Sequence, residues 1–157
     1  MKKLLFTICM MLISAASFAQ QGKMTVGIHG AYIIDSPHNF GLGANIGYEF
    51  IDNLRGVAEF DYYFKKDYVS FWEVDANVEY LFRLSGGKVA LYPLIGLNVL
   101  GQSVGDTQTV SDSKLGMNIG AGVEIPVSSS IALKAEYNYK TQGNGASFLK
   151  FGVVIPF

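Results

Sequence analysis

The chain has 157 residues, half of them hydrophobic, and its 12 basic and 13 acidic residues leave a formal net charge of −1. This length is typical of one small domain, and the balanced charge lacks the basic excess of a nucleic-acid-binding protein, so no nucleic-acid partner is expected. The single cysteine, Cys9, has no partner for a disulfide within the chain.

Residues 1–19 have the features of a secretory signal peptide. Lys2 and Lys3 form a positive start, residues 4–13 are nearly all apolar, and Ser17-Phe18-Ala19 offers small residues at the cleavage positions. The apolar run is shorter than the about 20 residues that a membrane-spanning helix needs. We therefore expect export through the inner membrane with cleavage after Ala19, which leaves residues 20–157 as a single domain.

Eight segments of alternating apolar and polar residues follow, and this period of two residues predicts strands. Each segment is long enough for a tilted transmembrane strand, which needs about 9 to 11 residues. The last segment ends on Phe157, and a long apolar edge strand invites aggregation unless the sheet closes. We predict an all-β fold, a closed eight-stranded antiparallel up-and-down transmembrane β-barrel. The expected strands are 23–34, 39–50, 54–65, 68–82, 88–101, 114–125, 130–140 and 147–157.

The two faces of these segments differ in charge. In the third segment Phe60 and Tyr62 share one face, while Glu59 and Asp61 share the other. Segment 88–101 is apolar on both faces apart from Asn98, so its register is the least determined; we place Leu91, Pro93, Ile95, Leu97 and Val99 on the apolar face. The predicted polar network on the opposite faces consists of Glu49, Arg55, Glu59, Asp61, Lys65, Glu73, Asp75, Glu79, Glu124, Lys134, Glu136, Lys140 and Lys150.

Two kinds of closed barrel share this alternation and orient it in opposite ways. A soluble lipocalin-like carrier places apolar residues inside around a ligand, whereas a membrane barrel places them outside against lipid. An eight-stranded barrel is just wide enough to hold its own side chains, and glycines such as Gly43 and Gly120 share the charged face, where they leave room. We therefore predict a membrane barrel whose apolar face contacts outer-membrane lipids.

The connections and the aromatic residues predict the orientation. Short connections at 51–53, 83–87 and 126–129 alternate with others that include the longest, 102–113, and outer-membrane barrels keep their short turns in the periplasm. Both termini are therefore expected in the periplasm. Aromatic residues near the strand ends predict two interfacial girdles, formed by Tyr32, Phe64, Trp72 and Tyr137 at one end and by Tyr48 and Tyr80 at the other.

Residues 54–63, 92–97, 118–124 and 133–137 carry a family resemblance. The chain resembles the small eight-stranded outer-membrane β-barrel proteins, the OmpA-like and opacity-type domains of Bacteroidetes-type bacteria. This resemblance implies the bacterial outer membrane as the location and an eight-stranded barrel as the fold, and we expect a monomer. It also implies that Phe157, with Ile155, Val153 and Phe151, is a signal read by the barrel-assembly machinery.

The polar network leaves two functions open. It can be a salt-bridged plug in a structural or surface-interaction protein, or it can line a narrow cation-preferring channel, since acidic residues outnumber basic ones and carboxylate rings favour cations. An extracellular partner could bind through the outer loops, of which 102–113 is the longest.

We expect no enzyme, cofactor or metal. Ser36 and His38 could supply a nucleophile and a base, but they flank Pro37 in an expected loop. Glu73, Asp75 and Glu79 alternate along one extended strand, which spreads them apart instead of wrapping them around an ion. His29 is expected as a hydrogen-bonded interior residue.

Overall fold

A computed structural model describes residues 23–35, 38–66, 69–104 and 109–157, and the side chains of 65–69 and 102–112 are left aside. The predicted signal peptide, Ser36 and the Lys65 side chain therefore lie outside what is described. Within these ranges no helix has the length and apolarity needed to cross a membrane.

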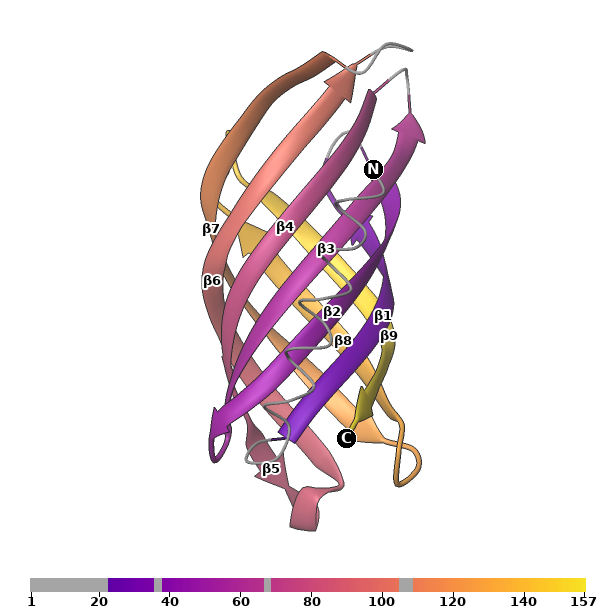
Figure 1. Cartoon of the computed structure of the whole chain (residues 1–157), viewed down its shortest axis with the longest axis vertical. Helices are drawn as coiled ribbons and strands as arrows, with labels where there is room; N and C mark the ends of the chain where they lie inside the picture. Colours follow the sequence, from indigo (N-terminus) through magenta and orange to yellow (C-terminus); the bar gives the residue numbers. More distant parts are fainter. Residues whose placement is uncertain (1–22, 36–37, 67–68, 105–108) are drawn as a thin grey trace, which may run out of the picture.

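The described chain is a closed antiparallel barrel (Figure 1). Consecutive strands pair from β1 to β4 and from β5 to β9, and β9 returns to pair with β1. Both β4 and β5 pair with β6. β4 and β5 form one barrel strand interrupted at Leu81, so the barrel is eight-stranded and the predicted fold is confirmed. The elements are β1 (Lys23–Ile33), β2 (Asn39–Ile51), β3 (Leu54–Lys66), β4 (Val69–Tyr80), β5 (Phe82–Leu84), the 3₁₀ turn η1 (Ser85–Gly87), β6 (Val89–Val104), β7 (Thr109–Pro126), β8 (Ala132–Lys140) and β9 (Ala146–Pro156).

The two termini of the described chain meet at one end of the barrel. The amide of Met24 donates to the carbonyl of Phe157 at 3.1 Å, and the amide of Phe157 donates to the carbonyl of Met24 at 2.9 Å. This pairing satisfies the backbone of the last strand, as closure of the sheet requires. We call this end, drawn at the bottom of Figure 1, the lower end, and the opposite end the upper end.

The predicted long polar loop at 102–113 is wrong. β6 continues to Val104 and β7 begins at Thr109, with a register shift between Gly101 and Gln102, so only 105–108 separate the two strands. A strand that rises past the membrane has water on both faces, so its sequence loses the alternation that marks a strand inside lipid. The ends therefore differ more in strand length than in loop length, and the loop-length argument for periplasmic termini loses most of its weight.

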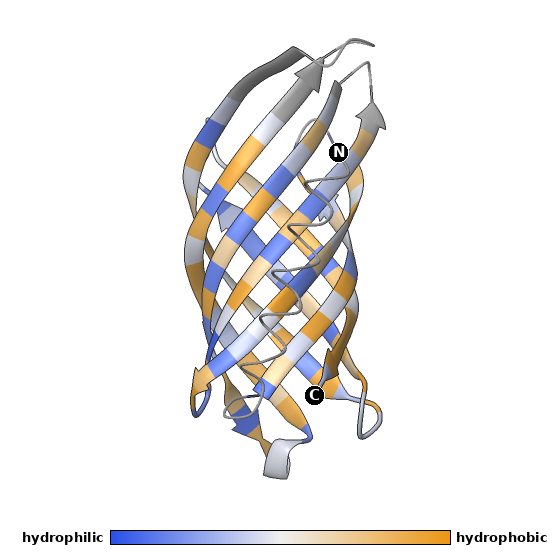
Figure 2. Cartoon of the chain, viewed as in Figure 1, coloured by the Kyte–Doolittle hydropathy of each residue, from blue (hydrophilic) through white to orange (hydrophobic). Residues whose placement is uncertain are grey.

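The outer wall is apolar and the inner wall is polar, and Figure 2 shows the two characters alternating along the strands. Ile28, Ile95 and Leu115 are 64 %, 54 % and 71 % exposed. In β6, Leu91 and Leu97 face outward while Tyr92, Leu94 and Asn98 are buried, as the sequence analysis placed them. A lipocalin-like carrier would show the reverse arrangement.

The expected girdle aromatics all lie on the outer wall. Tyr32, Phe64, Tyr80 and Tyr137 are exposed, whereas Tyr48 and Trp72 are partly covered. Trp72 packs over its cross-strand partner Gly101, where a β-carbon would collide with the indole ring. The position of these rings near the strand ends is typical of an interfacial belt.

Candidate functional site: the charged lumen

The interior of the barrel contains two groups of charged side chains, one above the other. The upper cluster consists of Glu59, Asp61, Glu73, Asp75, Lys140 and Lys150 together with His29. The lower cluster consists of Arg55, Glu79, Glu124, Lys134 and Glu136 together with the hydroxyl of Tyr92. Successive side chains of a strand point to opposite faces of the sheet. Each of these residues occupies a position whose side chain points into the barrel.

Two lysines hold the upper cluster together across the lumen. Lys150 Nζ on β9 lies 2.7 Å from Asp61 Oδ2 and 3.2 Å from Asp75 Oδ2, and it also contacts Glu59. Lys140 Nζ on β8 lies 2.7 Å from Glu73 Oε1 and 2.8 Å from Asp75 Oδ2. The carboxylates come from β3 and β4, so these ion pairs connect walls of the barrel that do not neighbour each other in the sheet.

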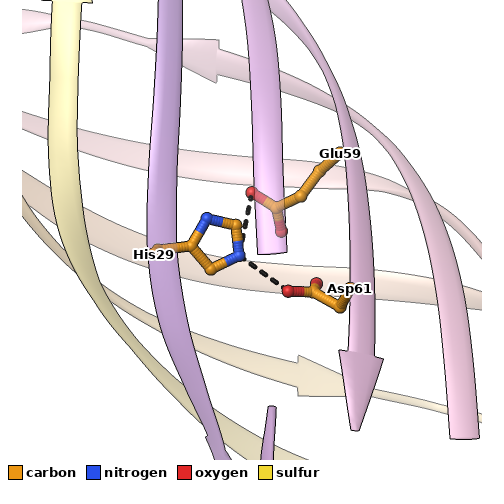
Figure 3. A group of neighbouring side chains, drawn as sticks. All are labelled: His29, Glu59 and Asp61. Carbon is orange, nitrogen blue, oxygen red and sulfur yellow. Dashed lines mark hydrogen bonds and ion pairs between the residues drawn. The ribbon is translucent and has the colours of Figure 1, made fainter. Parts of the chain in front are cut away.

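His29 on β1 joins the same cluster (Figure 3). Its Nε2 lies 2.7 Å from Asp61 Oδ1 and 4.0 Å from Glu59 Oε2, while Asn45 lies 3.3 Å from its Nδ1. The ring is therefore held at both nitrogens, which is the expected role of a hydrogen-bonded interior histidine.

The lower cluster is organised by Arg55 and Lys134. Arg55 bridges Glu79, at 2.5 Å, and Glu124. Lys134 Nζ lies 2.8 Å from Glu136 Oε2 and 3.3 Å from Glu79 Oε1. Each cation thus contacts two carboxylates, which keeps the buried charges compensated.

Glu49, the remaining predicted network residue with a described side chain, lies apart at the lower rim. Its Oε2 lies 2.6 Å from the guanidinium of Arg83, which is partly exposed. Sequence reasoning had left Arg83 in a turn, whereas the structure places it in β5, beyond the interruption at Leu81.

Glycines on the inner wall make room for the large polar side chains. A β-carbon at Gly43 would collide with Asp61 and His29, and one at Gly120 would collide with Asn138. The wall is therefore thin where the charged groups are bulky, and the lumen is filled by side chains, as an eight-stranded barrel requires.

Apolar residues close the lumen at both ends. The upper cap is formed by Ala31, Tyr63 and Phe148, with Ile33, Phe71 and Ala146 packed against them. Tyr63, Phe148 and Phe71 each stand two residues further up their strand than Asp61, Lys150 and Glu73. The lower cap is formed by Leu81, Tyr92 and Leu94, with Ala90 packed against them.

The arrangement is therefore a packed ionic interior between two apolar caps. Along one strand, sequence reasoning spread Glu73 and Asp75 apart, but it did not foresee which neighbours face them. Cross-strand pairing places Asp61 opposite Glu73 and Glu59 opposite Asp75. At the upper end, His38 stacks on Tyr32 with ring centroids 6.1 Å apart, and its suggested partner Ser36 lies outside the described residues.

Comparison with known families agrees with this geometry. The outer membrane protein beta-barrel domain family matches residues 5–154. The chain belongs to this family. The description of this family agrees with the closed barrel and its apolar outer wall, and it points to the bacterial outer membrane. No curated protein sequence shows significant similarity to the chain.

Several solved outer-membrane barrels share the family fold. Neisserial surface protein A is 22% identical, with a TM-score of 0.73 over 87% of this chain and 97% of that one. The N-terminal β-barrel domain of Pseudomonas aeruginosa OprF is 20% identical, with a TM-score of 0.69 over 87% of this chain and 100% of that one. The attachment invasion locus protein Ail of Yersinia pestis is 17% identical, with a TM-score of 0.59 over 87% of this chain and 97% of that one. At these identities the likeness concerns the fold.

Proposed function

We propose that this family member is an exported, monomeric, non-enzymatic outer-membrane barrel whose lumen is a closed ionic plug, with a structural or surface-interaction role. The observation that carries the proposal is the filling of the lumen by charge pairs between two apolar caps. Residues 1–19 would direct export, and the barrel-assembly machinery would read Phe151, Val153, Ile155 and Phe157 as the assembly signal.

The plug is favoured over a channel because a conducting path needs water along the axis. Asp61 and Glu73 have no exposed surface, and Lys140 is 1 % exposed. Opening a path would separate buried charges from their partners, and breaking a buried ion pair costs about 3 to 5 kcal/mol. The acidic surplus is therefore held inside a closed wall.

A surface role is supported by the upper end of the barrel. The β6–β7 hairpin rises past the other strands in Figure 1, and it is the longest pair in the barrel. A protein of the same fold is named for attachment and invasion. Replacing 103–110 by a short turn should leave assembly intact and remove binding to a surface partner; binding that survives the change would contradict a surface role for this hairpin.

Three measurements on the full chain test this function. The expected results are recovery in the outer-membrane fraction, a change of gel migration on boiling, and silence in planar bilayers, with an open porin as the positive control. Steady cation-selective openings would contradict the plug and show that the lumen is a channel. Recovery in the soluble periplasm together with bound lipid would instead support a lipocalin-like carrier.

A further inference from the structure

The interior of the barrel has unpaired acceptors. Among the described residues, the buried side-chain atoms without a hydrogen-bond partner are the Oδ1 atoms of Asp75, Asn98, Asn118 and Asn138. All are oxygens that can only accept. The amide nitrogens of the three asparagines are already used, since they donate to Glu73, Asn77 and Glu136. An unpaired buried acceptor is costly, so these oxygens call for a donor or a cation.

Asp75 carries the unpaired oxygen that belongs to a charged side chain. Lys140 and Lys150 both contact its Oδ2, at 2.8 and 3.2 Å, and leave Oδ1 without a partner although the residue is 1 % exposed. Asn98, whose Oδ1 is also unpaired, is the cross-strand partner of Asp75 on β6. The Oδ1 of Asn98 lies on the side of Gly116 on β7, so the unpaired oxygen within the upper cluster is Asp75 Oδ1.

The charge of the upper cluster points the same way. Its four carboxylates face two ammonium groups, which leaves a formal charge of −2 while His29 is neutral. Each of Asp61, Glu73 and Asp75 offers one oxygen, and these oxygens all lie within 4.8 Å of one another. One divalent cation would neutralise the cluster.

We propose that the upper cluster binds one Ca²⁺ ion between Asp61, Glu73 and Asp75. Ca²⁺ takes six to eight oxygen ligands in a flexible geometry, whereas Mg²⁺ requires a near-ideal octahedron and keeps several waters. An irregular, all-oxygen group inside a filled barrel fits the first ion better. Asp75 offers its unpaired Oδ1 to the ion, while Lys140 and Lys150 stay on its Oδ2.

The neighbouring group of His29, Glu59 and Asp61 is less suited to a metal. Its ligand atoms also lie within 4.8 Å of one another. However, Lys150 contacts both of its carboxylates, and the group lacks Asp75, whose Oδ1 is unpaired. None of its side-chain oxygens is left without a partner.

Calcium uptake during folding tests the site directly. The mature chain is refolded from urea into detergent free of lipopolysaccharide, with radioactive Ca²⁺ present, and is then desalted. We expect about one Ca²⁺ per barrel in the wild type and in the control E49Q, whose carboxylate lies at the lower rim, and at least a tenfold loss in D75N. No retention by the wild type, or equal retention by D75N, would overturn the proposal.

A second measurement keeps the test decisive if D75N does not fold. The hydroxyl of Tyr63 lies 3.4 Å from Glu73 Oε2, so a Tb³⁺ ion in the site should emit when tyrosine is excited. We expect Ca²⁺ to abolish the emission, and Y63F to reduce it severalfold while retaining calcium. Emission equal in Y63F would place the ion elsewhere. The conductance of the barrel is measured separately, so failure of this site leaves the plug proposal standing.

Discussion

Tyr92 on β6 and Gly122 on β7 are cross-strand partners, and the phenol ring of Tyr92 covers the position that a β-carbon on Gly122 would occupy. The same ring donates its hydroxyl to Glu136 at 2.8 Å and has the Lys134 ammonium 5.2 Å from its centroid. A thin wall at Gly122 thus lets one aromatic side chain close the lower end and bind the lower cluster.

Replacing Gly122 by alanine should therefore destabilise the barrel. The added methyl group forces Tyr92 from its place, and overpacking of this kind costs about 1 to 3 kcal/mol. Urea unfolding in lipid vesicles, followed by the fluorescence of the single tryptophan, measures the change. Gly56→Ala is the control, because its β-carbon would face the lipid side with its nearest neighbour at 3.4 Å. Equal effects of the two changes would refute the packing argument.

Removing the hydroxyl of Tyr92 isolates its hydrogen bond. Tyr92→Phe keeps the ring over Gly122 but removes one of the donors to Glu136, which Lys134 and Asn138 still contact. The expected loss is that of one hydrogen bond to a charged group, about 1.5 to 3 kcal/mol. Tyr62→Phe, on the exposed outer wall, should change the free energy of unfolding much less. The same unfolding assay compares them, and a Tyr92→Phe barrel as stable as the wild type would show that the bond contributes nothing.

The fold could be predicted because a strand that crosses lipid has a period of two residues with opposite chemistry on its faces. Glu59 and Phe60 are adjacent in sequence, yet one is 4 % and the other 50 % exposed, as the pattern implied. The same reasoning failed where lipid no longer constrains both faces. That is why the upper part of the β6–β7 hairpin, with its pair Val104 and Thr109, was taken for a loop.

The grouping inside the lumen could not be predicted from alternation alone. The alternation along each strand determines which residues point inward. The register of each strand pair then determines which of these side chains contact one another. Lys150 reaches Asp75, 75 residues earlier in the chain, because the barrel closes and both walls face one narrow lumen. Sequence spacing along β4 alone therefore gave no reason to expect a cation site there.

The ring of Phe157 should matter for assembly in cells more than for the finished barrel. The Met24–Phe157 backbone bonds survive in Phe157→Ala, so refolding in vitro should be unchanged, while the amount in the outer membrane should fall severalfold. Phe82→Ala removes another exposed aromatic at the lower end and is the control. Immunoblots of outer-membrane fractions measure the amount of each variant. Equal amounts of the two variants would show that Phe157 is not part of the assembly signal.

A charge on the outer wall should be penalised according to depth. Ile28 is exposed at the middle of β1, and a lysine near the bilayer midplane costs about 2 to 4 kcal/mol, against about 0 to 1 near the interface. Ile28→Lys should therefore destabilise the barrel in lipid vesicles more than Leu84→Lys, which lies in β5 at the lower end. A larger loss for Leu84→Lys would mean that the lipid does not surround this belt.

Lys150 carries the largest share of charge compensation in the upper cluster. Lys150→Met keeps most of the side-chain length but removes the cation from Glu59, Asp61 and Asp75. Loss of one partner of a buried ion pair costs about 3 to 5 kcal/mol, so unfolding in the presence of a chelator should occur at clearly lower urea. Lys88→Met, on the exposed lower turn, should have little effect. Adding Glu59→Gln to Lys150→Met should restore part of the stability, because it removes one uncompensated carboxylate; a further loss would show that charge balance does not govern the packing of this lumen.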